Sequence, residues 1–293
     1  MNRKSIDLIL LFILGSIWGT GTVINKYVMV RGIDPISYTF WQFIGPGIIL
    51  FFITYLKKEL RYNHKHILFY LTCGIIGLAI PSLIIHLCAL KLPAGILPVV
   101  INTVPIIVYP LSVFFKQEKF TLIRFIAVVL GVCGILILLV PKANVPLSWF
   151  WPLFASIAPL CFAINSLFVN PNRPKNSNAL TLATGMLLSS AIVMLPFLLY
   201  IQHDLYIPIF PLAKVDYILI LRMFMHCLGY VIYFSILKRA GPVYYSLVSG
   251  IVILSGLFWA YYIHQEVLNI YQAIAIVLVV AGIYILTYSR KKT

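Results

Sequence analysis

The sequence predicts an all-α, polytopic membrane protein in which ten transmembrane helices form two inverted five-helix repeats. Hydrophobic residues make up 62% of the 293 residues, and charged residues make up only 10%. The mean hydropathy is +1.01, so the chain has too little polar surface to cover a water-soluble globule. Apolar segments recur along its whole length, and stretches of the first half recur in the second.

The apolar segments have about the 20 residues that a helix needs to cross a bilayer. We expect ten of them, at 7–29, 35–56, 66–90, 93–115, 121–140, 148–169, 178–201, 215–237, 241–263 and 267–288. Proline removes a backbone donor, so Pro46 predicts a kink in the second segment. Pro98, Pro105 and Pro110 predict an interruption of the fourth. The connections leave no room for a soluble domain.

The net charge of +15 reflects orientation in a membrane rather than nucleic-acid binding. If the N-terminus is cytoplasmic, most Lys and Arg residues fall at cytoplasmic ends, and the other side holds only Arg31, Lys91, Lys142 and Lys214. This asymmetry predicts a multi-pass protein of the cell (inner) membrane with both termini in the cytoplasm and no nucleic-acid partner. The cysteines stand singly in apolar segments, without metal-ligand spacing, so we expect neither a metal nor a cofactor.

Two stretches of the first half have counterparts in the second half. In one match, Ser16, Ile17, Ile24 and Asn25 correspond to Ser156, Ile157, Ile164 and Asn165. In the other, Gln117, Glu118, Ala127 and Gly134 correspond to Gln265, Glu266, Ala275 and Gly282. Each half has five spans, and because five is odd the second half must lie inverted relative to the first. We therefore predict two repeats, residues 1–143 with spans one to five and residues 144–293 with spans six to ten.

Ionisable groups within membrane spans are costly and are functional candidates by default. Here they are Lys26, His86, Arg222 and His226. Arg222, His226, Tyr230 and Tyr233 share one face of the eighth span, since steps of four, four and three residues keep to one side of a helix. We expect a basic, aromatic-lined cavity in which Arg222 holds a carboxylate or phosphate. Further candidates for substrate binding are Trp18, Asn25, Asn102, Tyr109 and Asn165.

The same residues have purely structural alternatives. Lys26 and Arg222 can extend to lipid head groups, and His86 and His226 can donate to carbonyls of packed helices. Glu118 and Glu266 each precede a span, where a carboxylate favours a helix N-terminus. No Asp or Glu lies deep within a predicted span, so proton coupling would fall on the two histidines. A facilitator or an exchanger needs no such coupling.

The chain resembles the drug/metabolite transporter superfamily, specifically its ten-span, EamA-like members. The residues that carry the resemblance are Trp18-Gly19 with Asn25-Lys26, Pro105 before Glu118, Gly131-x-x-Gly134, and Glu266 with Gly282. The family often repeats its fourth-span proline in the ninth span, where this chain has Ile253, with Ser249 and Gly250 nearby. The resemblance implies a central cavity lined by spans one, three, four, six, eight and nine.

The resemblance also implies secondary transport of small metabolites, and it implies several classes of possible substrate. An amino acid, or another zwitterion or anion, fits the basic cavity best, while nucleotide-like or adenosyl compounds and xenobiotics are the alternatives within the superfamily. The expected partners are the lipid bilayer, a small-molecule substrate, and protons or a counter-substrate, with the protein a monomer or homodimer. An intramembrane enzyme is the alternative of another class, but the sequence has no His-Glu-x-x-His and no Gly-x-Ser-x-Gly motif. A receptor-like membrane protein would not need buried cations on facing helices.

Overall fold

The computed structural model describes residues 3–58, 66–116, 118–138, 150–172, 174, 177–200, 205–208, 210–245 and 248–289. Every regular element in these ranges is a helix. The first half contains α1 (Arg3–Met29), α2 (Pro35–Leu56), α3 (Ile67–Gly74), η2 (Ile75–Ala79), α4 (Ile80–Ala89), α5 (Ile96–Ile101), α6 (Val104–Phe114) and α7 (Leu122–Leu138). The second half contains α8 (Phe150–Ala155), α9 (Ile157–Asn172), α10 (Ala179–Tyr200), α11 (Lys214–Tyr245), α12 (Val248–His264) and α13 (Ile270–Ser289). Gln117 and the predicted repeat boundary at 143–144 lie outside the described residues.

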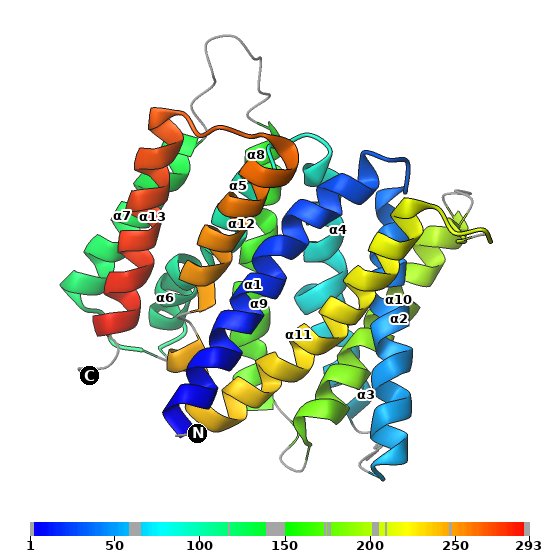
Figure 1. Cartoon of the computed structure of the whole chain (residues 1–293). Coiled ribbons are helices and arrows are strands. Elements are labelled where there is room, and N and C mark those ends of the chain that lie inside the picture. The colour runs from blue at the N-terminus through cyan, green and yellow to red at the C-terminus, as the bar shows by residue number, and fades with distance from the viewer. Residues whose placement is uncertain are drawn as a thin grey trace.

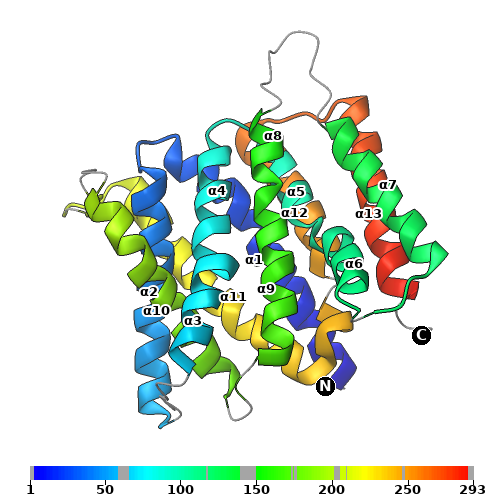
Figure 2. The same cartoon turned by 180° about the vertical axis from the view of Figure 1, so that it is seen from behind.

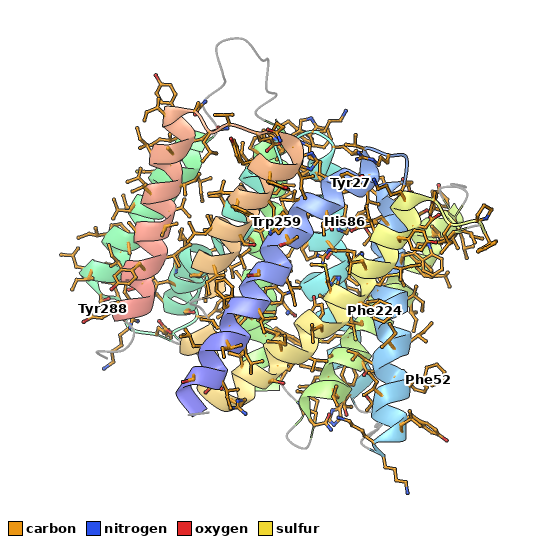
Figure 3. All side chains as sticks on the ribbon, in the orientation of Figure 1. Tyr27, Phe52, His86, Phe224, Trp259 and Tyr288 are labelled. Atoms are coloured by element: carbon orange, nitrogen blue, oxygen red, sulfur yellow. The ribbon has the colours of Figure 1, made fainter. Side chains whose placement is uncertain are left out.

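The helices are those of a multi-pass membrane protein. Within the described residues, 7 helical segments are long and apolar enough to cross a membrane: Ser5–Met29, Pro35–Leu56, Ile67–Ala89, Ile96–Phe114, Phe150–Val169, Ala179–Tyr200 and Lys214–Ile236. Three shorter apolar helices cover Leu122–Ile137, Val248–His264 and Ile270–Leu286. Each predicted segment therefore contains a helix, while the number of crossings stays a prediction. The predicted boundary between the eighth and ninth spans is wrong, because α11 continues through 238–240 to Tyr245. Large apolar side chains such as Phe52 and Phe224 are exposed on the outside of the bundle, where lipid would cover them (Figure 3).

Three of the predicted spans are interrupted helices, and in the sixth the break lies at Ser156, between α8 and α9. The π-turn η2 separates α3 from α4, directly before Pro81, whose missing N–H prevents a regular α-helical bond at this point. The fourth span is broken at Asn102 and Thr103, between α5 and α6, and Pro105 lies in the first turn of α6. This interruption is the one that the prolines predict. Pro46, by contrast, lies within the continuous helix α2.

Helices α7 and α13 lie side by side and antiparallel (Figure 1). Gly134 faces the backbone of Ala275, where an added Cβ would lie 2.8 Å from the carbonyl oxygen. Gly282 faces the carbonyl oxygen of Ala127, at 2.7 Å from an added Cβ. Small residues allow this close approach of backbones. The two contacts are reciprocal, because Gly134 and Ala127 are the residues that match Gly282 and Ala275 in the sequence.

Helix α1 packs against α4, α5, α11 and α12. Figure 1 shows α1, α11 and α12 crossing one face of the molecule, and Figure 2 shows α4, α6 and α9 on the opposite face. Gly19 lets α1 approach α12, since an added Cβ would lie 2.6 Å from the carbonyl oxygen of Val252. The start of α1 and the end of α13 lie on the same side of the bundle (Figure 1).

Candidate functional site

Arg222 of α11 lies at the centre of a buried polar cluster. Its side chain is only 6% exposed. The Nε–H donates to Asn25 Oδ1 on α1 at 3.2 Å, and the hydroxyl of Tyr38 on α2 donates to the same oxygen at 2.7 Å. The guanidinium lies over Gly21, where a Cβ would collide with it. The glycine in α1 therefore makes the space that the arginine occupies.

Two histidines extend this cluster on either side. His86 of α4 shares a hydrogen bond of 2.7 Å with the Thr39 hydroxyl, and its ring meets Tyr38 edge-on at 4.8 Å between centroids. His226 shares a hydrogen bond of 2.7 Å with Gln42 Oε1. His86 reaches Arg222 through Tyr38 and Asn25, and His226 lies one helical turn after Arg222 on α11. The structure thus brings together Asn25, His86, Arg222 and His226, as the sequence predicts.

An aromatic wall adjoins the cluster on the side of His226. The Tyr230 ring stacks on His226 with centroids 5.0 Å apart. Trp18 of α1 lies 6.4 Å from Tyr230, 5.8 Å from Tyr233 and 6.1 Å from Tyr245 between ring centroids. Three of these rings are predicted site residues, and Tyr245 is an addition. The wall is continuous with the basic cluster because His226 and Tyr230 are neighbours on one face of α11.

Helix α2 supplies three members of the cluster that the sequence does not single out, namely Tyr38, Thr39 and Gln42. Polar side chains are also common between helices that pack without any ligand, so their presence in an apolar span is a weak signal. Tyr38 and Gln42 are four residues apart and lie on one face of the helix. That shared face is the signal that the sequence offers for Tyr38 and Gln42, but it does not show which helix the face contacts.

Arg222 has no acidic partner among the described residues. The acidic side chains there are engaged elsewhere: Asp7 with Arg239, Asp34 at the start of α2, Glu118 with Arg124, Asp216 with Tyr206 and Ala213, and Glu266 with Lys26. Arg222 Nη1 and Gln42 Nε2 are buried and have no hydrogen-bond partner in the described part of the chain. A buried cation with an unpaired donor is costly, and an anionic ligand would remove that cost.

Lys26 makes its contacts outside this cluster, and its expected role in substrate binding stays a prediction. Its Nζ donates to Glu266 Oε1 at 2.9 Å and to the carbonyl oxygen of Leu92 at 3.0 Å. Glu266 also accepts from the backbone N–H groups of Ala94 at 2.8 Å and Gly95 at 3.0 Å. The carboxylate therefore binds the start of α5 rather than its own following helix. The ion pair joins Lys26 to the second half of the chain.

The environment of Glu266 sets its protonation. Burial alone would raise the pKa of the carboxyl group, but the hydrogen bonds from Gly95, Lys26 and Ala94 outweigh it and lower the pKa below the usual 4.5.

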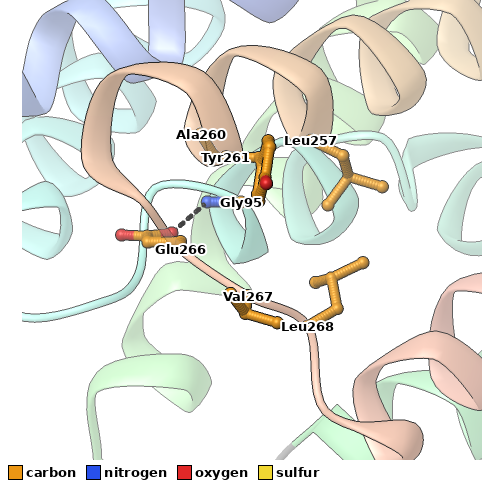
Figure 4. A pocket seen from close by; sticks show the side chains of 7 residues that line it. All are labelled: Gly95, Leu257, Ala260, Tyr261, Glu266, Val267 and Leu268. Atoms are coloured by element: carbon orange, nitrogen blue, oxygen red, sulfur yellow. Dashed lines mark hydrogen bonds between the residues drawn. The ribbon is translucent and has the colours of Figure 1, made fainter.

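Beside Glu266 a pocket of about 300 Å³ is lined mainly by apolar side chains of α12 and the following loop (Figure 4). Its lining residues are Gly95, Leu257, Ala260, Tyr261, Glu266, Val267 and Leu268.

Three other predicted site residues make their contacts elsewhere. Asn102 Nδ2 donates to the Pro98 carbonyl oxygen at 2.7 Å, at the break between α5 and α6. The Tyr109 hydroxyl accepts from the Thr121 N–H at 2.8 Å, near the start of α7. Asn165 packs its amide against Gly77 of η2, and its Oδ1 is buried without a hydrogen-bond partner in the described residues. These contacts do not join any of the three to Arg222.

Helix α1 carries an ion pair near each of its ends. Asp7 Oδ1 lies 2.7 Å from Arg239 Nε of α11. Lys26, which follows Asp7 by 19 residues in the same helix, pairs with Glu266 near the other end. In Figure 1 the start of α1 is at the bottom and its end is at the top, beside the loop that joins α12 and α13. Each pair therefore joins α1 to the second half of the chain, on opposite sides of the bundle.

Comparison with known proteins gives three similarities. The model of the EamA-like transporter family matches residues 6–140 and 149–288. A protein of Archaeoglobus fulgidus described as an uncharacterized transporter is 25% identical over 191 residues, which are 65% of this chain and 66%, just under two thirds, of that protein. A protein of known crystal structure superposes with a TM-score of 0.66 at 16% identity, covering 98% of both chains. At that identity the last similarity concerns the fold alone.

Proposed function

Because the chain belongs to the EamA-like transporter family, we propose that it carries an amino acid, or a similar zwitterionic or anionic metabolite, by alternating access. It is a membrane-embedded transporter, and both the family and the relative point away from an enzyme. The proposed binding site is the cluster around Arg222, with the aromatic wall of Trp18, Tyr230 and Tyr233 beside it.

The observation that carries this proposal is the state of Arg222. It is almost completely buried, it has no carboxylate partner among the described residues, and its Nη1 is without a hydrogen bond. A guanidinium matches the two oxygens of a carboxylate in geometry and charge. The same argument disfavours a purely cationic solute, since no buried acid near the cluster would offset its charge. The aromatic wall suits an apolar or aromatic part of the solute.

Alternating access is supported by the arrangement of equivalent helices. The reciprocal Gly134–Ala275 and Gly282–Ala127 contacts between antiparallel α7 and α13 are those expected of two inverted repeats. The repeats would comprise residues 1–143 and 144–293. The ion pairs Asp7–Arg239 and Lys26–Glu266 then act as gates between the halves. A solute reaches Arg222 when one gate opens while the other stays closed.

A nucleotide-like or adenosyl compound is the second candidate substrate. It is favoured by one observation, the aromatic wall, because nucleobases stack on tyrosine and tryptophan rings. Its phosphate or carboxylate would occupy the same place beside Arg222. We further propose that the protein resides in the cell (inner) membrane as a monomer or homodimer, with cytoplasmic termini and no nucleic-acid partner. Protons or a counter-substrate would be its coupling partners if transport is coupled.

Flux of labelled solutes into reconstituted vesicles tests the proposal. Amino acids, nucleosides, nucleotides and organic anions are compared, and Arg222→Ala is expected to reduce flux of the transported solute by about 10-fold or more. Arg31→Ala is the matched control, because Arg31 is an exposed arginine that rests on the Tyr27 ring. Unchanged flux in Arg222→Ala, with correctly folded protein, would remove the basic cluster as the binding site.

A further inference from the structure

We infer that Gln42 is a second anion-binding residue, and that its amide and the Arg222 guanidinium together hold one carboxylate of the solute. This inference rests on the proposed function, because it names the atoms that would recognise the anionic group. Gln42 lies on α2 and Arg222 lies on α11, so the carboxylate would bind between two helices rather than to one side chain.

The two residues occupy neighbouring levels of the same helix pair. At one level Tyr38 of α2 and Arg222 of α11 meet on Asn25 Oδ1, and at the other Gln42 of α2 meets His226 of α11. The step from Tyr38 to Gln42 and the step from Arg222 to His226 are both four residues toward the C-terminus, so α2 and α11 run in the same direction here. The levels are separated by about 6 Å along the helix axes. The free donors of Gln42 and Arg222 therefore belong to side chains at adjacent levels of the same helix pair.

Both donors are sealed from solvent and lack a partner. Gln42 is 1% exposed, and its Nε2 has no hydrogen bond, just as Arg222 Nη1 has none, in the described part of the chain. A buried donor without a partner destabilises a protein. Two such donors in one cluster indicate a ligand that supplies two acceptor atoms. A carboxylate supplies two acceptor oxygens. It also supplies the negative charge that would balance the charge of Arg222.

His226 fixes the direction of the Gln42 amide. A glutamine carbonyl oxygen can only accept, so the His226–Gln42 bond requires the Nδ1–H form of the ring. The Tyr230 ring stacks on His226 and holds its plane. With Oε1 bound to the ring, the NH₂ group of Gln42 is left as the free donor. His226 is thus a positioning residue that presents the amide to the anion.

The test uses the purified full-length protein and matched pairs of probes. Each L-amino acid is compared with its amide, in which a neutral carboxamide replaces the carboxylate, and affinity is measured by thermal stabilisation. The wild type is expected to favour the acid. Gln42→Leu is expected to weaken binding of the acid by about 10-fold or more, and binding of the amide much less. Gln42→Glu is expected to abolish the preference for the acid, because the new carboxylate neutralises Arg222.

The control variant is Gln272→Leu, which removes another buried glutamine, one that bonds Asn269 at the start of α13. It is expected to keep the preference for the acid. If Gln42→Leu does not fold, Gln42→Glu and the shorter amide in Gln42→Asn carry the test. The ratio of the affinities for acid and amide decides the role of Gln42. If this ratio is unchanged in the folded Gln42 variants but reduced in Arg222→Ala, the role of Gln42 is overturned and the site at Arg222 stands. A wild type that does not discriminate acids from amides overturns the proposed anion site as well.

Discussion

Lys26 and Glu266 form an ion pair, with Nζ 2.9 Å from Oε1, that joins α1 to the loop between α12 and α13. The same carboxylate accepts hydrogen bonds from the N–H groups of Ala94 and Gly95. One side chain therefore connects three parts of the chain at one end of the bundle. Removing either partner would leave the other charge partly buried, which is more costly than losing the pair as a whole.

We expect Glu266→Gln to lower the stability of the folded protein by about 1 kcal/mol or more. Lys26→Met should have a similar effect, and the double variant should lose less than the sum of the two, because each single change leaves an unpaired group. Thermal unfolding in detergent measures all three. Additive losses in the double variant would contradict direct coupling of Lys26 and Glu266.

The pH dependence of stability follows from the lowered pKa of Glu266. The unfolded chain takes up a proton near the ordinary pKa of 4.5, and the folded chain takes it up only at lower pH. The stabilisation by this group is therefore present above pH 4.5 and is lost as the pH falls through the folded-state pKa. We expect the melting temperature of the wild type to fall in this acid range by more than that of Glu266→Gln. Parallel curves for the two proteins would show that Glu266 does not contribute.

The sequence predicts the helices better than it predicts the partners of the charged residues. Hydropathy alone places a helix in each of the expected segments, and the prolines near Asn102 mark the break between α5 and α6. The spacing of Arg222, His226 and Tyr230 predicts a shared face because it depends only on helix geometry. These properties are local, so a single sequence contains them.

Contacts between distant segments are the part that could not be predicted. Glu266 precedes α13, which suggests a local role at that helix, but its partners Lys26, Ala94 and Gly95 belong to the other half of the chain. Gln42 is one polar residue in an apolar span, and only the packing of α2 on α11 places it against His226. Both assignments depend on which helices touch, and periodicity does not contain that information.

The ion pair at the other end of α1 gives a prediction about access. Asp7→Asn removes the pairing with Arg239 and should open the route to the cluster from that side. A cysteine placed by Tyr230→Cys, in a chain without its natural cysteines, reports this opening through its rate of alkylation by a membrane-impermeant reagent. We expect Asp7→Asn to speed alkylation several-fold from the side of Asp7, and Lys26→Met to do so from the opposite side. Equal rates from both sides in every variant would exclude a gating role for these pairs.

The contact between α7 and α13 predicts a strong effect of added side-chain volume. Gly134→Leu places a side chain where even a Cβ would lie 2.8 Å from the Ala275 carbonyl oxygen, so the helices must separate. We expect a loss of about 1–3 kcal/mol in stability, and a similar loss for Gly282→Leu. Gly250→Ala is the control, since an added Cβ there has nothing within 4 Å among the atoms described. Thermal unfolding that ranks Gly250→Ala as the most harmful change would refute this packing.

The two histidines of the cluster give a prediction about energy coupling. His86 and His226 are the imidazole groups of the cluster around Arg222, and imidazole is the side chain that most often carries protons in transport and catalysis. His86→Gln and His226→Gln keep a hydrogen-bonding side chain at each position, next to Thr39 and Gln42. We expect any response of solute flux to an imposed pH gradient to disappear in the double variant, while counter-flow of unlabelled solute continues. A strong response that survives in the double variant would place the proton pathway elsewhere. A wild type without a response would identify the transport as facilitation or exchange, which need only the anion site.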